Sequence, residues 1–206
     1  MEISISLILI CLVCAVSYFA FQNNELKYKL LFIPYQAKHN NEIYRFLSHT
    51  LIHADYTHLI FNMFVLYSFG EGLEYFLSTE FALSVARLHF IIIYLAGGLF
   101  ATVWPYSKHQ DNSSYMSLGA SGAVSAVVFA CILWNPSMEL RFLFIPFPIK
   151  AWLFGILYLA FEYYMAKRGN SNIGHDAHFG GAVFGIVYIL LINFDKGKEF
   201  ISAIFG

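Results

Sequence analysis

Four polar residues stand out because each lies near the start of a strongly apolar segment. His58 and Asn62 are four residues apart, Ser121 lies in Gly-Ala-Ser-Gly, and His178 lies in Ala-His-Phe-Gly-Gly. A polar side chain inside an apolar, membrane-like segment costs free energy unless it finds a partner, so such residues are candidates for function. A serine that comes within ~3 Å of a histidine can be activated as a nucleophile. The residue types therefore predict nucleophilic chemistry, provided that the fold brings Ser121 and His178 together.

The segments that carry these residues belong to a strongly apolar chain of 206 residues, of which 59% are hydrophobic and 12% charged. This composition excludes a disordered chain, a nucleic-acid-binding protein and a disulfide scaffold. A membrane span needs about 20 apolar residues, and ~17 are tolerated in a crowded bundle. We predict a single-domain all-α membrane protein (residues 1–206), a helical bundle with six spans at residues 3–21, 58–76, 88–104, 119–134, 149–165 and 178–194.

The direction of these spans predicts where the polar residues meet. In a chain that crosses the membrane with every span, the second, fourth and sixth spans run the same way and begin on the same side. Their polar residues then lie at one depth. Small residues accompany two of these starts, and they let helix backbones approach closely. These are Gly119, Gly122, Gly181 and Gly185.

Each feature also has an ordinary structural explanation. A serine in a membrane helix often bonds a carbonyl one turn earlier. Glycines four residues apart often serve packing alone. A histidine near the end of a span is often an interfacial anchor, an interpretation that also applies to His49, His53, His89, His109 and His175. Because three separate spans supply complementary groups at one level, the combination favours a site.

The segment of residues 22–57 is the longest polar stretch between spans. It combines the basic residues Lys27, Lys29, Lys38 and Arg45 with an apolar run around Phe32. Apolar and basic residues together are typical of segments that lie in a membrane interface. We therefore expect this first loop to be associated with the membrane surface.

The motifs around the polar residues resemble those of the rhomboid intramembrane serine proteases. HADYTHLIFNM (residues 53–63) resembles the family's second-span motif, and GASG (119–122) is similar to its nucleophile motif. AHFGGAVFG (177–185) fits the family pattern Ala-His-x-x-Gly-x-x-x-Gly, and EIYRFLSHTLIH (42–53) resembles the end of its first loop. The order of the motifs and the number of predicted spans make the resemblance specific.

The resemblance implies a serine endopeptidase that cleaves a peptide bond in or near a substrate's transmembrane helix. Ser121 would be the nucleophile and His178 the general base of a dyad. His58, Asn62 and the backbone N–H of Ser121 are the candidate oxyanion donors, since the first N–H groups of a helix have no partner within it. The partners would be transmembrane protein substrates and the lipid bilayer, with no nucleic acid, no cofactor and no metal.

Two departures from the family pattern stand out, and the first of them leaves open how the ring of His178 is held. Many family members have a tyrosine four residues after the nucleophile, where this chain has Ser125, and many have Trp-Arg where it has Tyr44 and Arg45. No carboxylate is evident that would orient His178. Asp176 is off the same helix face, and Glu162 is expected near the opposite end of the fifth span.

Three other functions compete with this prediction. A rhomboid-like protein without activity would bind and escort membrane proteins, but such proteins lack the serine or the histidine, and this chain has both. A transporter would need polar residues through the full depth of the membrane, where Glu71 and Glu74 are the deeper exceptions. A metal-dependent hydrolase would use His58 and His178 with His53 or His175 as a third ligand, without the HExxH motif.

Location and assembly rest on weaker signals. Lysine and arginine residues are divided almost evenly between the two sets of loops, so the positive-inside rule does not decide the orientation. The resemblance implies a site that faces the extracytoplasmic side. With no transit peptide visible, a bacterial plasma membrane is the expected location, and the oligomeric state stays open.

Overall fold

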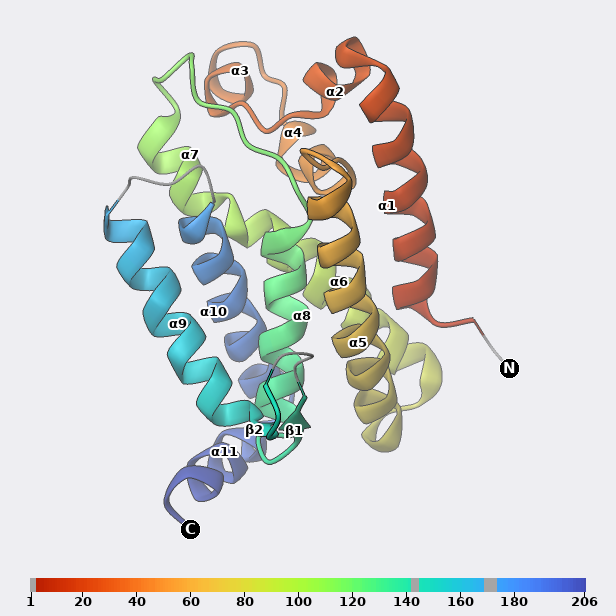
Figure 1. The fold of residues 1–206 in the computed structure, drawn as a ribbon, viewed down its shortest axis with the longest axis vertical. Coiled ribbons are helices and arrows are strands. Elements are labelled where there is room, and N and C mark those ends of the chain that lie inside the picture. The colour runs from red at the N-terminus through yellow and green to blue at the C-terminus, as the bar shows by residue number, and fades with distance from the viewer. Residues whose placement is uncertain (1–2, 142–144, 169–173) are drawn as a thin grey trace.

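A computed structural model describes residues 3–141, 145–168 and 174–206 as a helical bundle (Figure 1). Its long helices are α1 (Ile5–Gln22), α5 (Tyr56–Glu80), α6 (Leu83–Ala101), α8 (Ser121–Trp134), α9 (Ala151–Arg168) and α10 (His175–Ile192). The short elements are α2 (Asn24–Leu30), α3 (Pro34–His39), α4 (Arg45–Ser48), the 3-10 helix η1 (His49–Leu51), α7 (Val103–His109) and α11 (Asp195–Phe205). A two-stranded antiparallel sheet pairs β1 (Glu139–Leu140) with β2 (Ile149–Lys150).

The six predicted spans overlap the six long helices, with ends that differ by a few residues. Three helical segments in the described residues are long and apolar enough to cross a membrane, namely Ile5–Gln22, Leu83–His109 and His175–Ile192. α8 is apolar but shorter. Polar residues such as Asn62 and Glu71 reduce the hydropathy of α5, and Glu162 and Lys167 reduce that of α9. The structure thus confirms a helical membrane-type bundle, whereas the number of six spans is not confirmed by it.

α8 forms the centre of the bundle. It packs against α5, α6, α9 and α10, and every one of its residues after Ser121 is buried. A helix that is apolar on all sides is stable in an interior rather than at a surface. Ser121 is the first residue of α8, so it lies where this central helix begins among its neighbours (Figure 1).

α8 and α10 approach each other to backbone contact. A Cβ atom built on Gly181 would lie 2.0 Å from the carbonyl oxygen of Gly122, and one built on Gly185 would lie 2.2 Å from that of Ala126. Real side chains never come so close, so only glycine fits at these two positions. The glycine spacing along α10 therefore sets the distance between the two helices.

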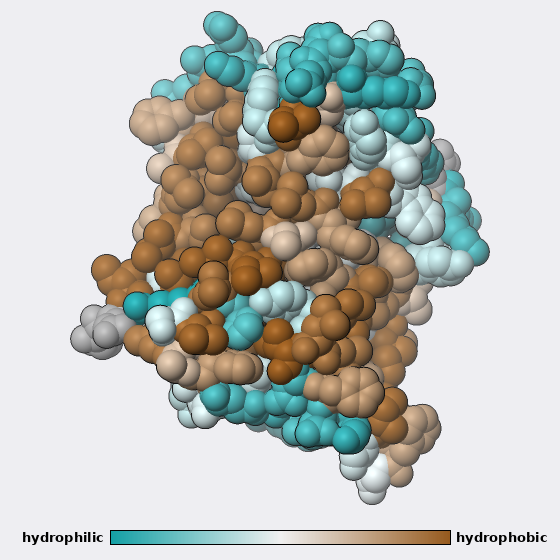
Figure 2. All heavy atoms as spheres, turned by 180° about the vertical axis from the view of Figure 1, so that it is seen from behind, coloured by the Kyte–Doolittle hydropathy of each residue, from teal (hydrophilic) through white to brown (hydrophobic). Residues whose placement is uncertain are grey.

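The outer surface of the bundle is strongly apolar. Figure 2 shows hydrophobic side chains over much of the middle of one face, with hydrophilic ones gathered towards the upper and lower ends. Large apolar side chains such as Phe61, Phe64 and Leu191 are exposed. Apolar patches of this extent mark contact with lipid or with a partner, and the apolar helices identify lipid as the main solvent.

Charged side chains join α1, α5 and α11 at the end of the bundle opposite Ser121. The Glu74 carboxylate accepts the backbone N–H groups of Ile5 (2.9 Å) and Ser6 (2.6 Å), which caps the start of α1. An anion at a helix N-terminus is stabilised by the helix dipole. At the same end, Lys196 of α11 pairs with Glu80 (3.2 Å) and lies 5.1 Å from the centre of the Trp134 ring, at the end of α8.

Arg45 holds the first loop together. Its buried guanidinium donates from Nη1 to the carbonyl oxygens of Tyr28 (2.9 Å), Lys29 (2.8 Å) and Leu31 (2.7 Å), and its Nε pairs with Glu42. The last carbonyls of a helix have no partner within it. Arg45 therefore caps α2 and ties that helix to α4.

Gly185→Ala should destabilise the protein by about 3 kcal/mol, because the new methyl group must push α8 and α10 apart. Gly180→Ala is the matched control on the same helix, since its Cβ would lie 3.4 Å or more from its neighbours. Thermal unfolding in detergent should give a lower midpoint for Gly185→Ala alone. Equal midpoints for both variants would contradict the backbone contact.

Arg45→Lys should destabilise the first loop by about 1–3 kcal/mol, because a lysine ammonium cannot reproduce the planar fork that reaches several carbonyls. Arg141→Lys, at an exposed position, is the control. Limited proteolysis between residues 22 and 57 should be faster in Arg45→Lys and unchanged in Arg141→Lys. Equal cleavage rates would show that the cap contributes little.

Candidate active site

The side chains of Ser121 and His178 meet at one end of the bundle. The Oγ atom of Ser121, the first residue of α8, lies 2.7 Å from Nε2 of His178, in the first turns of α10. The two helices run parallel, and their glycine contact lies immediately below this pair. The short serine side chain reaches the imidazole because the backbones are so close.

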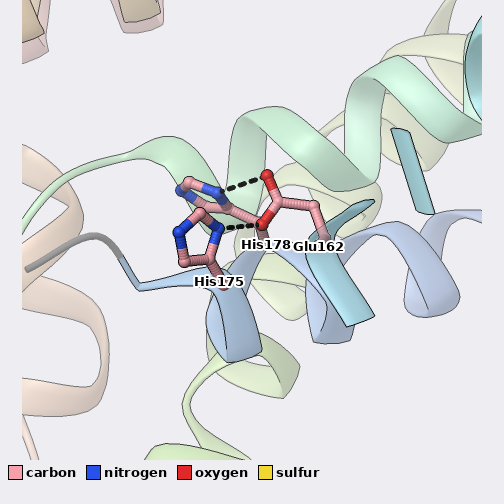
Figure 3. Close-up of side chains that lie close together, drawn as sticks. All are labelled: Glu162, His175 and His178. Carbon is pink, nitrogen blue, oxygen red and sulfur yellow. Dashed lines mark hydrogen bonds and ion pairs between the residues drawn. The ribbon is translucent and has the colours of Figure 1, made fainter. Parts of the chain in front are cut away.

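Glu162 of α9 contacts the other side of the same imidazole (Figure 3). Its Oε1 lies 3.2 Å from Nδ1 of His178, and its Oε2 lies 2.6 Å from Nδ1 of His175. The Glu162 side chain is 4% exposed, against 14% for His178. Glu162 does lie towards the end of α9, but the expectation that no carboxylate orients His178 is wrong. Because α9 and α10 are antiparallel, the end of α9 lies beside the start of α10 (Figure 1).

The hydrogen positions on His178 follow from these contacts. An ionised carboxylate only accepts hydrogen bonds, so Nδ1 of His178 must carry the proton that points at Glu162. In the neutral imidazole, Nε2 then has a free lone pair and accepts the hydroxyl proton of Ser121. This is the tautomer that a general base needs.

Tyr158 and Ser125 complete the surroundings of Glu162. Tyr158, one turn before Glu162 on α9, lies close to the Glu162 carboxylate and to Ser125. Ser125 is buried one turn after Ser121. In the place where many family members have a tyrosine on α8, this chain has a serine, and a tyrosine from α9 reaches the cluster instead.

The loop before Ser121 is held by the first loop of the chain. Gly119 has a φ of +120°, which favours glycine, and its N–H donates to the carbonyl oxygen of His49 (3.0 Å). The Ala120 N–H donates to Nε2 of His53 (3.4 Å). A Cβ atom at Gly119 would lie 2.8 Å from Cε1 of His58, so glycine is also needed for space.

His53 links this loop to α1. Its Nδ1 lies 3.0 Å from Oγ of Ser17, whose hydroxyl donates to the carbonyl oxygen of Leu51 (3.0 Å). Burial lowers the pKa of His53 to about 3 and that of His49 to about 4, so both rings are neutral at physiological pH. The interpretation of these two histidines as interfacial anchors is wrong, because both are buried.

His58 and Asn62 lie one turn apart on α5, next to this loop. His58 is half-buried beside Gly119, and its ring centre is 5.0 Å from that of His53. Asn62 is buried, and its Nδ2 donates one proton to the carbonyl oxygen of His58 (2.9 Å). The second proton on Nδ2 and the His58 ring are the polar groups that α5 brings towards the start of α8.

Sequence reasoning missed Glu162 and the role of His53. The signal for Glu162 was its place in the last turns of the fifth span, directly before the segment that leads to His178. His53 had a weaker signal, because its partners Ser17 and Ala120 come from distant parts of the chain. A histidine in a loop does not reveal its partners before the fold is known.

Glu162, His175 and His178 also form the group among the described residues whose atoms could hold a metal ion, with ligand atoms within 4.8 Å of one another. Two histidines and one glutamate are a ligand set that catalytic zinc uses. This differs from the alternative considered from the sequence, which combined His58 with His178. In the structure the same atoms are engaged in hydrogen bonds.

Comparison with known proteins identifies relatives for most of the chain. The model of the rhomboid domain matches residues 40–193. RHOMBOID-like protein 12, mitochondrial, from Arabidopsis thaliana is 32% identical over 159 residues, covering 68% of this chain and 45% of that protein. The human presenilin-associated rhomboid-like protein, mitochondrial, is 31% identical over 142 residues, covering 68% and 35%. Rhomboid protease GluP from Bacillus subtilis is 27% identical over 184 residues, covering 84% and 32%.

These relatives correct the expected location. This chain spans less than half the length of the relatives that it matches. The relatives named here at 30% identity or more are described as mitochondrial, and this finding contradicts the expected bacterial plasma membrane with an extracytoplasmic site. The domain match over residues 40–193, together with these identities, shows that the chain belongs to the rhomboid family.

Proposed function

We propose that this chain is an intramembrane serine endopeptidase that hydrolyses a peptide bond in or near the transmembrane helix of a substrate protein. The observation that carries the proposal is the 2.7 Å contact between Oγ of Ser121 and Nε2 of His178. The similarity to a bacterial rhomboid protease supports the same chemistry. We infer further that all six long helices lie in the bilayer and that the first loop lies at its surface.

The reaction follows from the tautomer of His178. The Oγ atom of Ser121 attacks the scissile carbonyl carbon while Nε2 takes the hydroxyl proton. The imidazolium then gives this proton to the leaving amine, and the C–N bond breaks to leave an ester on Ser121. Water attacks the ester, His178 takes a proton from the water, and the serine hydroxyl is restored as the acid product leaves.

The oxyanion of each tetrahedral intermediate needs hydrogen-bond donors. The N–H of Ser121 is in the first turn of α8, where backbone donors are available and the helix dipole favours negative charge. His58 and Asn62 add side-chain donors from α5. The hydrogen bonds from Gly119 and Ala120 to the first loop keep this turn rigid, so the donors need not reorganise during the reaction.

A metal-dependent hydrolase is the second candidate, because Glu162, His175 and His178 lie close enough to share a cation. In that case the cation would replace the protons between these residues, and Ser121 would not be needed as a nucleophile. A chelator separates the two mechanisms.

Ser121→Ala and His178→Ala should abolish cleavage of a reporter substrate with one transmembrane helix, measured by gel analysis of purified protein in detergent. A fluorophosphonate probe should label the wild-type protein and neither variant, because labelling requires an activated serine. Ser107→Ala, at an exposed position, is the control and should keep full activity and labelling.

Retained cleavage in Ser121→Ala would overturn the proposal, as would loss of wild-type activity on chelation. A folded wild-type protein that binds the reporter without cleaving or labelling would indicate an escort protein.

His58→Ala and Asn62→Ala should each lower kcat by on the order of 10²-fold with little change in KM, because oxyanion donors act mainly in the transition state. Tyr67→Phe, at an exposed position on the same helix, should leave both constants unchanged. Steady-state kinetics on the reporter would measure this. A raised KM with an unchanged kcat would make these residues substrate contacts instead.

A further inference from the structure

The Glu162 carboxylate is a charged group inside a largely apolar bundle, where polar side chains of the candidate site contact it. Glu162 is buried, and both of its oxygens are used, one by His178 and one by His175 (Figure 3). Tyr158 lies close to the same carboxylate. A buried charge costs several kcal/mol of desolvation unless donors compensate it. Here every partner that compensates it also fixes its orientation.

We propose that Glu162 is the positioning residue of His178, so that Ser121, His178 and Glu162 form a catalytic triad rather than a dyad. The inference rests on the proposed protease function. His175 has a supporting role: its Nδ1 binds Oε2 of Glu162 and keeps the other carboxylate oxygen aimed at Nδ1 of His178.

The first contribution of Glu162 is to the tautomer. Nδ1 of His178 faces a group that only accepts hydrogen bonds, so the neutral ring keeps its proton on that side. Nε2 is then free to receive the proton of Ser121 at 2.7 Å. Without the carboxylate the ring can carry its proton on Nε2 instead, and in that form it cannot act as the base.

The second contribution is to the charge that develops during the reaction. When His178 takes the proton from Ser121, its ring becomes positively charged and forms an ion pair with the Glu162 carboxylate. An electrostatic interaction that strengthens in the transition state lowers the barrier, and it does so most in a site of low dielectric constant. The Glu162 side chain, 4% exposed, is in such a site.

The geometry explains why the ring of His178 is held although Ser125 replaces the aromatic residue common in the family. A serine on α8 cannot pack against the imidazole as a tyrosine would. The carboxylate of Glu162 binds the ring through a directed hydrogen bond instead. The support of the histidine has moved from α8 to α9.

Glu162→Gln should lower kcat by on the order of 10²–10⁴-fold with KM nearly unchanged. The amide has almost the same shape, but its NH₂ group can face Nδ1 and favour the wrong tautomer. Glu162→Asp keeps the carboxylate and should recover part of the lost kcat. The rate of fluorophosphonate labelling should fall in the same order as kcat, because it reports on Ser121 without a peptide substrate.

Glu74→Gln is the matched control, since Glu74 also accepts two hydrogen bonds but lies at the other end of the bundle. It should lower the thermal unfolding midpoint without changing kcat. If Glu74→Gln lost as much kcat as Glu162→Gln, the effect would follow stability and the positioning role would be overturned. The role would also be overturned if Glu162→Gln kept kcat within about 3-fold of the wild type, since a wrong tautomer costs far more.

The experiment separates failure of this inference from failure of the proposed function. If the wild-type protein cleaves the reporter, Ser121→Ala is inactive and Glu162→Gln is fully active, the protein is a serine protease with a dyad and this inference alone is wrong. If the wild-type protein shows neither cleavage nor labelling, the proposed function itself fails. Restoration of chelator-treated wild-type protein by zinc would make the three residues a metal site and overturn the positioning role.

Discussion

The backbone contact between α8 and α10 is the constraint on which the rest of the structure depends. Gly181 and Gly185 bring α10 against the carbonyl oxygens of Gly122 and Ala126, closer than any other residue would allow. A serine side chain is short, so it reaches a histidine on another helix only at such a separation. The close packing of α8 and α10 therefore allows the 2.7 Å contact between Oγ of Ser121 and Nε2 of His178. A substitution that separates these two helices therefore also separates Ser121 from His178.

A second set of contacts holds the entry to α8 from outside the bundle. His49 and His53 bind the N–H groups of Gly119 and Ala120, and His53 is anchored in turn by Ser17 of α1. The first loop is therefore part of the scaffold that shapes the turn before the nucleophile candidate. Arg45 extends this scaffold by capping α2. Burial keeps the two histidines neutral, which suits them to accept or donate hydrogen bonds in a structural role.

Much of this arrangement could be predicted from the sequence, because hydropathy locates the helices and the alternation of direction brings Ser121, His178 and His58 to one level. The same rule, applied to Glu162, would have found it: a residue late in one span lies beside a residue early in the next. The contacts of His53 could not be predicted, since they join α1, the first loop and the start of α8 through an irregular loop whose path no periodic pattern describes. The number of spans was the other weak point, because Asn62, Glu71 and Glu162 lower the hydropathy of helices that the fold nevertheless keeps in the bundle.

The length of α8 has a consequence for how water reaches a site inside an apolar molecule. Because α8 is surrounded by protein, its length need not match the thickness of a bilayer. Its 14 residues extend over about 21 Å, whereas the hydrocarbon core measures about 30 Å. The Trp134 end lies beside the ion pair of Lys196 and Glu80, so on our proposal that the bundle spans the bilayer the shortfall would fall at the Ser121 end. At that end the chain continues into the loop whose Gly119 and Ala120 N–H groups bind the first loop, and Ser121 is partly buried. On our proposal, the length of α8 would therefore set the depth of Ser121 below the membrane surface, and the loop before it would be the part of the chain that water must pass to reach the serine.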